Sequence, residues 1–150
     1  MAEHFKSHSA VLLIIPREIS NGKQILLQRR QNTGYIDGKL DIPGGHVDEG
    51  ETAVTAMIRE AKEELGIDVA AEDLTFVHLQ HRLAQHRTYY DIYFAATKYN
   101  GTPQVMEPEK CAELIWGDLS ALPDDVIECR KDVLSRYAKS EFYSEWDERG

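Results

Sequence analysis

The sequence has only two cysteines, Cys111 and Cys129, which are too few for a disulfide framework and do not form a Cys-x-x-Cys pair. Long apolar runs are also missing, because the longest covers only residues 10–16. A bilayer-spanning helix needs about 20 apolar residues, and no small-residue cleavage site marks a signal peptide. These absences predict reduced thiols in a cytoplasmic protein that makes no membrane contact.

Basic residues are scarce as well. Seventeen Lys and Arg stand against twenty-six Asp and Glu, which gives a net charge of −9. A nucleic-acid binder needs a basic stripe to neutralise phosphates, and none of sufficient size is present. The sequence therefore argues against a nucleic-acid partner. Small nucleotides remain possible ligands, because divalent metals bridge carboxylates to phosphate oxygens.

The chain's 150 residues, 42% hydrophobic and 29% charged, suit one globular domain. No repeat, low-complexity tract or linker divides it. We expect a single domain over residues 1–150, with a core at about 6–138 and a C-terminal tail at 139–150.

Hydrophobic periodicity predicts the order of the elements. The turn signal Asn21-Gly22 indicates that the first two strands form a hairpin. Gly66 is suited to end the first helix, and Pro123 to begin the second. Because strands and helices do not alternate regularly, the pattern favours an α+β fold with a mixed sheet flanked by helices. The predicted strands cover residues 9–16, 24–30, 40–42, 74–83, 88–99 and 114–116, and the predicted helices cover 52–65 and 123–137.

Three glutamates of the first predicted helix share one face, since Glu60, Glu63 and Glu64 are spaced at i, i+3 and i+4. We call them the helix acids. They repel one another, and they lie in the C-terminal half of the helix, where the helix dipole disfavours anions. A hard divalent cation with oxygen ligands would compensate this charge. The alternative is a solvated helix face, but Gly44-Gly45 just before the helix favours a metal and pyrophosphate site.

This stretch resembles the signature of the Nudix hydrolase superfamily. That signature is Gly, five residues, Glu, seven residues, and then Arg-Glu-apolar-x-Glu-Glu-x-Gly-apolar. The resemblance covers about a sixth of the chain and implies a Nudix-type α/β/α sandwich. Every specified position is matched without a gap, by Gly45, Glu51, Arg59, Glu60, Ala61, Glu63, Glu64, Gly66 and Ile67.

The resemblance implies hydrolysis of a nucleoside diphosphate linked to a moiety X. It assigns the helix acids as catalytic ligands of Mg²⁺, with Mn²⁺ as a substitute, and makes the Gly44 carbonyl a further metal ligand. It also implies that Arg59 orients the acids through a salt bridge, with Glu51 as its partner. The general base stays open between the helix acids and a loop acid outside the signature. Glu107, Glu109 and Glu113 all compete for the role of that loop acid, and Glu107 is our first candidate.

Four residues outside the signature are candidates for binding substrate. Arg29 would pair with a phosphate, and Tyr35 would stack on a base or sugar. His46 would contact a phosphate or a metal-bound water, and Glu113 would lie near a purine base. Each also has a purely structural interpretation, as surface charge, loop packing or loop polarity.

Sequence features that mark particular Nudix subfamilies are missing, and their absence reduces the number of candidate substrates. No proline lies between Pro43 and Pro103, although ADP-ribose-cleaving members carry one there, and the coenzyme A pattern lacks its second arginine. Asp41 also departs from the family, since many relatives have an aromatic or apolar residue before Pro-Gly-Gly.

What remains resembles a MutT-type enzyme that converts a (deoxy)nucleoside triphosphate to a monophosphate and pyrophosphate. The alternatives are a nucleotide-sugar or ADP-ribose-type diphosphatase, and a non-catalytic nucleotide-binding sensor. Sensor modules usually lose signature acids, and all of them are present here. The expected partner is a small-molecule nucleotide, and the chain would be a monomer or a homodimer.

Overall fold

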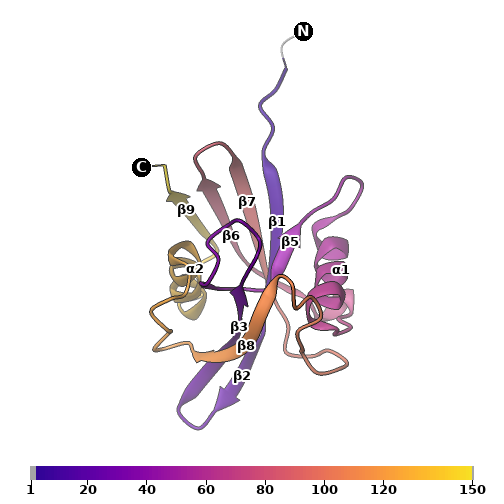
Figure 1. Ribbon diagram of the computed structural model, residues 1–150, viewed down its shortest axis with the longest axis vertical. Coiled ribbons are helices and arrows are strands. Elements are labelled where there is room, and N and C mark those ends of the chain that lie inside the picture. Colours follow the sequence, from indigo (N-terminus) through magenta and orange to yellow (C-terminus); the bar gives the residue numbers. More distant parts are fainter. Residues whose placement is uncertain (1–2, 150) are drawn as a thin grey trace.

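The computed structural model describes residues 3–149, which form two β-sheets and two α-helices (Figure 1). None of the helices in this range is long and apolar enough to cross a membrane. In chain order the elements are β1 (His8–Ile14), β2 (Pro16–Ile19), β3 (Gly22–Arg30), β4 (Leu40–Asp41), β5 (Gly44–His46), α1 (Ala53–Leu65), the 3₁₀ turn η1 (Ala71–Asp73), β6 (Thr75–Leu83), β7 (Thr88–Ala95), β8 (Cys111–Asp118), α2 (Glu128–Ala138) and β9 (Tyr143–Asp147).

The larger sheet is mixed and has the strand order β5-β1-β7-β6-β9. Strand β1 runs parallel to β7 and antiparallel to β5, and β6 and β7 form the long antiparallel pair that the sequence predicts. The second sheet is antiparallel, with order β2-β3-β4 and with β8 paired to β3. The fold is thus α+β, as predicted, but its strands are shared between two sheets.

The predicted hairpin of residues 9–16 with 24–30 is wrong in its first strand. The turn at Gly22 joins β3 to the short strand β2, whereas β1 lies inside the larger sheet, between β5 and β7. Residues 11–14 of β1 are all buried, because a strand that is apolar on both faces needs cover on both. Strand β2 is largely exposed and therefore suits a sheet edge.

The second helix begins at Glu128 rather than at Pro123. The segment before it makes a turn at residues 124–125 and a bridge from Val126 to Leu40. The Leu40 N–H donates to Asp125 O at 2.9 Å, and its carbonyl accepts from Ile127 N at 2.9 Å. These tertiary hydrogen bonds hold residues 125–127 out of the helix.

The end of the chain also differs from the expected tail. Within residues 139–149, Tyr143–Asp147 form β9, which pairs in parallel with β6. Ser144 is buried and bonds the ring of His78 at 2.8 Å. The last strand thus completes the larger sheet, and its far end reaches the cavity described below.

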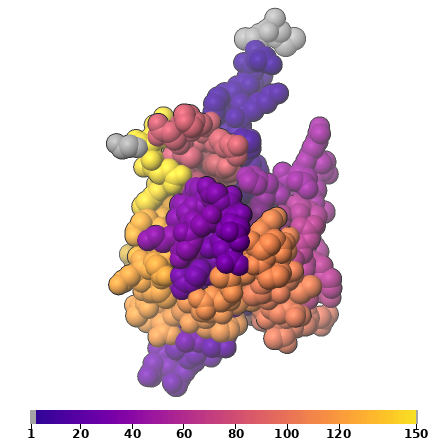
Figure 2. Space-filling model, in the orientation of Figure 1, coloured from indigo at the N-terminus to yellow at the C-terminus, as the bar shows by residue number. Residues whose placement is uncertain are grey.

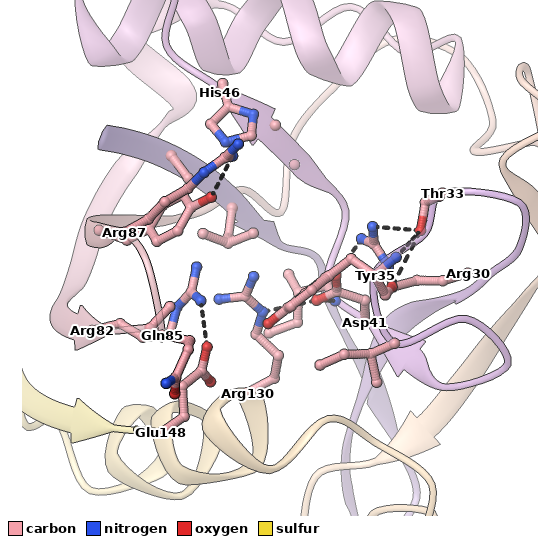
Figure 3. Close-up of a pocket in the computed structure, with 18 of the residues that line it drawn as sticks. Arg30, Thr33, Tyr35, Asp41, His46, Arg82, Gln85, Arg87, Arg130 and Glu148 are labelled. Atoms are coloured by element: carbon pink, nitrogen blue, oxygen red, sulfur yellow. Dashed lines mark hydrogen bonds and ion pairs between the residues drawn. The ribbon is translucent and has the colours of Figure 1, made fainter. Parts of the chain in front are cut away.

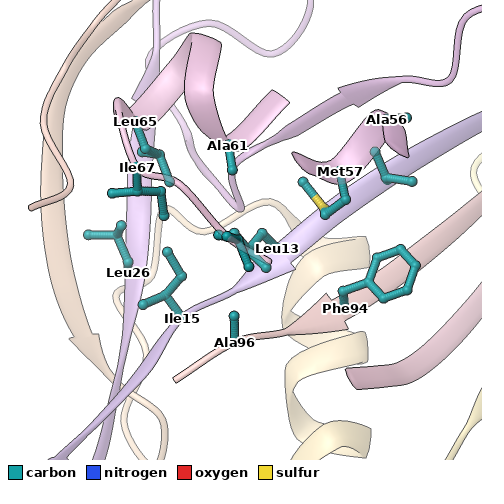
Figure 4. Packing of buried hydrophobic residues seen from close by; sticks show 12 residues of the cluster. Leu13, Ile15, Leu26, Ala56, Met57, Ala61, Leu65, Ile67, Phe94 and Ala96 are labelled. Atoms are coloured by element: carbon teal, nitrogen blue, oxygen red, sulfur yellow. The ribbon is translucent and has the colours of Figure 1, made fainter. Parts of the chain in front are cut away.

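Helix α1 covers one face of the larger sheet, as its apolar spacing predicts. It begins at the N-cap Thr52, whose hydroxyl accepts from Thr55 N at 3.2 Å, and it ends at Gly66 in the left-handed conformation (φ 70°). Figure 4 shows its buried side chains packed on β1 and β7. They are Ala56, Met57, Ala61 and Leu65. This packing fixes the helix acids at the side of the helix that faces β5.

Candidate active site

Arg59 is the centre of the acidic cluster on α1. Its Nε and Nη2 donate to the two carboxylate oxygens of Glu51 at 2.7 and 2.9 Å. Its Nη1 donates to Glu60 at 2.8 Å and to Glu63 at 3.1 Å, and Nη2 also donates to the His46 carbonyl at 3.1 Å. Hydrogen bonds from Arg59 lower the pKa of Glu51 to about 2. The contact between Arg59 and Glu51 is therefore a bidentate ion pair, as the resemblance implies.

Glu64 is the most deeply buried of the helix acids. Burial raises the pKa of its carboxyl to about 8, and the nearby Glu60 adds to the rise. The backbone N–H of Gly44 donates to Glu64 Oε2 at 3.1 Å, which ties α1 to β5. Glu64 also shares a small recess with Glu107. The structure therefore brings the predicted loop acid next to a helix acid.

Gly45 leaves room for the carboxylate of Glu60. A Cβ atom at this position would overlap the carboxylate of Glu60, so the backbone of β5 and that carboxylate are in close contact. Burial raises the pKa of Glu60, against the lowering effect of Arg59. A residue with any side chain at position 45 would push this carboxylate away.

The donor set around α1 fits a hard divalent metal. Glu51 and the helix acids carry four carboxylates against one guanidinium, and all available ligands are oxygens. Gly45 keeps the approach to Glu60 open. Within residues 3–149, no three acidic, histidine or cysteine side chains converge on one point as a ready metal group, and Arg59 donates to both Glu60 and Glu63. The residues that would hold the metal are the helix acids, with Glu107 beside them.

A cavity of about 660 Å³ lies on the other side of β5. This is a volume typical of small-molecule sites. Figure 3 shows charged side chains reaching into it from several directions. Gly44 and Gly45 form part of its wall, so a ligand in the cavity would lie next to the strand that contacts the helix acids. The wall is completed by residues of the 31–39 loop, β1, β6, β7, the β6–β7 turn, α2 and Glu148.

A buried ion-pair network forms the deep end of the cavity. Arg130 Nε donates to Asp41 Oδ1 at 2.8 Å, and Nη1 donates to Asp91 Oδ2 at 3.2 Å and to Tyr93 OH at 2.8 Å. Arg82 Nε donates to Asp91 Oδ2 at 2.6 Å. Both arginines and both aspartates are at most 5% exposed. Such a network costs desolvation energy, so stability alone is a poor reason for it.

Two further charged residues join the network at its edges. Arg30 Nη1 donates to the second oxygen of Asp41 at 2.9 Å, and Arg82 Nη1 donates to Glu148 Oε1 at 3.2 Å. The buried network then holds three arginines and three acids. It carries no net charge, in contrast to the acid-rich cluster on α1.

The loop of residues 31–39 covers the front of the molecule in the view of Figure 2, where it is the purple mass between the orange and red-pink segments. The Asp37 carboxylate accepts hydrogen bonds from the backbone of Thr33 and Gly34 and closes the loop on itself. Arg30 Nε donates to the Tyr35 carbonyl at 2.7 Å. These contacts fix the Tyr35 ring, whose hydroxyl is buried at the cavity.

The structure places the four predicted substrate residues in two groups. Tyr35 and His46 line the cavity. Arg29 and Glu113 do not, and they bond each other at 2.7 Å on the surface. Arg29 also donates to Asp125 at 2.6 Å. The predicted metal ligand Gly44 lies in β5, with its N–H on Glu64 and its backbone against the cavity.

Sequence reasoning missed the charged cavity residues Arg82 and Arg130 and their shared partner Asp91. One signal was available. In the predicted strand 74–83, His78, Gln80 and Arg82 occupy alternate positions, and all three are buried in the structure. A strand with polar side chains on its inward face indicates a polar interior partner. Asp91, which bonds Arg82, is only nine positions away on the predicted hairpin, whereas the partners of Gln80, Asp132 on α2 and Ser144 on β9, lie too far away in the sequence to be matched to it.

The chain belongs to the NUDIX domain family, whose model matches residues 6–137. It is similar to the dihydroneopterin triphosphate diphosphatase of Escherichia coli K12, with 36% identity over 92 residues that cover 53% of this chain and 58% of the relative. It is also similar to the 8-oxo-dGTP diphosphatase of the same organism, with 38% identity over 48 residues, or 32% of this chain and 37% of that one. The chain thus spans little more than half the length of the first of these relatives.

The fold agrees with solved structures of the family. The crystal structure of a MutT NUDIX hydrolase from Burkholderia pseudomallei aligns with a TM-score of 0.75 and 26% identity, covering 87% of this chain and 98% of that one. Nudix hydrolases generally use divalent metals and act on small nucleotide substrates. The predictions of the family and of the sandwich-type fold are confirmed.

Proposed function

We propose that this protein hydrolyses a (deoxy)nucleoside triphosphate to the monophosphate and pyrophosphate, with Mg²⁺ as its cofactor. The observation that carries the proposal is the arrangement around β5. The acid-rich cluster lies on one side of this strand, and a nucleotide-sized cavity lies on the other. A triphosphate whose nucleoside occupies the cavity would have its phosphates near Gly44, Gly45 and the helix acids.

Different residues of the chain have different roles in the proposed reaction. The helix acids would hold the metal, which would neutralise phosphate charge and lower the pKa of the attacking water. Arg59 positions Glu60 and Glu63 through the hydrogen bonds described above and is itself anchored by Glu51. Glu64 and the adjacent Glu107 are the candidates for accepting the proton of the attacking water.

The names of the relatives support a triphosphate substrate. One relative is named for dihydroneopterin triphosphate and the other for 8-oxo-dGTP. Each compound joins a fused-ring heterocycle to a triphosphate chain. A cavity beside an acidic metal site suits this division of the ligand into an uncharged and a highly charged part.

The test is hydrolysis of a substrate panel with Mg²⁺, with the products identified by chromatography. The panel holds several nucleoside triphosphates, ADP-ribose, a nucleotide sugar and a dinucleoside polyphosphate. We expect a triphosphate to give its monophosphate and pyrophosphate, and we expect Glu64→Gln to lose this activity. Preferred cleavage of ADP-ribose or the sugar would replace the proposal with the diphosphatase alternative. Tight nucleotide binding without any cleavage would make the protein a sensor.

A further inference from the structure

The deep end of the cavity contains two hydrogen-bond donors that the protein leaves unused. The hydroxyl of Tyr35 is shielded from solvent and has no hydrogen-bond partner among residues 3–149. Arg130 uses Nε and Nη1 to bind Asp41, Asp91 and Tyr93, whereas its Nη2 donates to no acceptor in the described part of the chain. Buried polar groups are nearly always satisfied, so the unpartnered Tyr35 hydroxyl beside the cavity indicates a missing ligand, to which Arg130 Nη2 would be a second donor.

The two donors lie at the same place. In Figure 3 the Tyr35 ring and the Arg130 guanidinium point toward one another across the cavity. Tyr35 lines the same cavity as Arg82 and Arg130. Burial raises the pKa of Tyr35 to about 12, so the hydroxyl keeps its proton and can donate it in a hydrogen bond.

The charge balance at this place selects the kind of acceptor. Every arginine of the network is matched by a carboxylate, through the pairs that Arg30, Arg82 and Arg130 form with Asp41, Asp91 and Glu148. The deep end therefore offers directed hydrogen bonds without excess positive charge. A phosphate would be poorly compensated there, whereas an uncharged carbonyl oxygen would accept both hydrogen bonds.

We propose that Tyr35 and Arg130 are the specificity-determining residues of the cavity, and that they bind the carbonyl oxygen of an oxo-substituted heterocycle. An amino group at the same ring position would bring its own N–H donors against those of the protein. The site would then reject amino-substituted bases because its buried donors would remain unpaired. This inference rests on the proposed function, since it assigns the uncharged part of the proposed substrate to this cavity.

Asp41 is a positioning residue in this account. Its two carboxylate oxygens accept from Arg130 and Arg30. The backbone N–H of the next residue, Ile42, also donates to this carboxylate. Arg30 in turn holds the backbone of Tyr35. A single buried carboxylate thus connects both specificity-determining residues, which gives a reason for the acidic residue at a position where many relatives have an apolar one.

The experiment compares inosine and adenosine 5′-monophosphates, which share sugar and phosphate and differ at purine position 6 and in the protonation of N1. Dissociation constants are measured by calorimetry without metal, so that binding is separated from hydrolysis. We expect the inosine compound to bind about tenfold more tightly, as one or two lost hydrogen bonds would require. Tyr35→Phe should reduce this preference about fivefold, while Tyr143→Phe, whose hydroxyl bonds Glu145 on the exposed strand β9, should preserve it.

Arg130→Lys keeps the positive charge but removes the planar guanidinium group. If this variant folds, it should also show a weaker preference for the inosine compound. Equal binding of the two compounds, no measurable binding of either, or an unchanged preference in Tyr35→Phe would each overturn the inference. In all these cases hydrolysis of triphosphates would still leave the proposed function standing. Failure to hydrolyse any triphosphate would instead refute the function itself.

Discussion

Two clusters of arginine and carboxylate side chains lie on either side of β5, and they differ in balance and in burial. On α1, Arg59 alone contacts Glu51, Glu60 and Glu63, and the uncompensated Glu64 lies next to them. In the cavity, three arginines meet three acids. A cluster with excess carboxylates favours binding of a cation. A network in which the charges balance can offer a ligand only hydrogen-bond donors. Under the proposed function, the same residue types would serve a charged and an uncharged part of one ligand.

The largest effect should follow a change in the acid-rich cluster. Glu64→Gln keeps the size of the side chain and an acceptor for Gly44 N–H, so the fold should persist. Because it removes a proposed metal ligand and proton acceptor, we expect kcat for the best triphosphate to fall about a thousandfold. Steady-state kinetics with saturating Mg²⁺ measure this change. Glu72→Gln, in the exposed turn η1, is the matched control, and an undiminished kcat in Glu64→Gln would contradict the account.

Breaking the balanced network should cost stability rather than chemistry. Asp41→Asn leaves Arg130 and Arg30 without their shared carboxylate in a buried site, and we expect the free energy of unfolding to drop by about 3 kcal/mol at pH 7. Urea denaturation followed by fluorescence provides the measurement. A variant as stable as the parent would show that the network does not depend on this carboxylate.

The stability loss in Asp41→Asn should depend on pH. Burial alone would raise the pKa of Asp41, but the charges of Arg130 and Arg30 outweigh burial and leave the pKa below its usual value of 3.8. A lowered carboxyl pKa stabilises the fold above the unfolded-state pKa and loses this effect as the pH falls through the folded-state value. The stability gap between the parent and Asp41→Asn should therefore narrow below about pH 4. A gap that stays constant down to pH 3 would argue against this assignment.

A smaller effect is expected at the strand between the clusters. Gly45→Ala would place a methyl group where the Glu60 carboxylate lies, and the displaced carboxylate would be poorly oriented. We expect kcat/KM to fall about thirtyfold, with the melting temperature as the check that the fold is intact. Full activity in this variant would mean that Glu60 does not need its present position.

The smallest effect is expected for a third group of charges, outside both clusters. Arg29 bonds Glu113 and Asp125 at the surface, where ion pairs contribute less than about 1 kcal/mol. Arg29→Met should therefore leave KM for a triphosphate unchanged and alter stability only slightly. A tenfold rise in KM would instead favour the sequence-based hypothesis that Arg29 binds phosphate.

The comparison of the clusters also shows what the sequence can predict. The acidic cluster is local: Glu51, Arg59 and the helix acids lie within 14 residues, and helical spacing is enough to bring them together. The metal-site hypothesis could therefore be made before the fold was known. The close contact of Gly45 with Glu60 follows from how β5 packs on α1, which no spacing rule provides.

The cavity could not be predicted in the same way. Arg130 and Asp41 are 89 positions apart, and they meet only because residues 125–127 pair with Leu40 instead of joining the second helix. Glu148 reaches Arg82 because the expected tail forms β9. The error at the start of the second helix, and the lack of any sequence signal for β9, therefore hid two walls of the site. Tyr35 and His46 were named from loop position alone, and the structure shows which surface they line.

The most direct test of the division between the clusters is a kinetic comparison of inosine and adenosine triphosphates in the parent protein, Glu64→Gln and Tyr35→Phe. The account predicts that Glu64→Gln lowers kcat for both substrates by the same factor and leaves their kcat/KM ratio unchanged. It predicts that Tyr35→Phe lowers this ratio about fivefold through the inosine compound. A ratio that changes in Glu64→Gln, or an equal loss for both substrates in Tyr35→Phe, would contradict it.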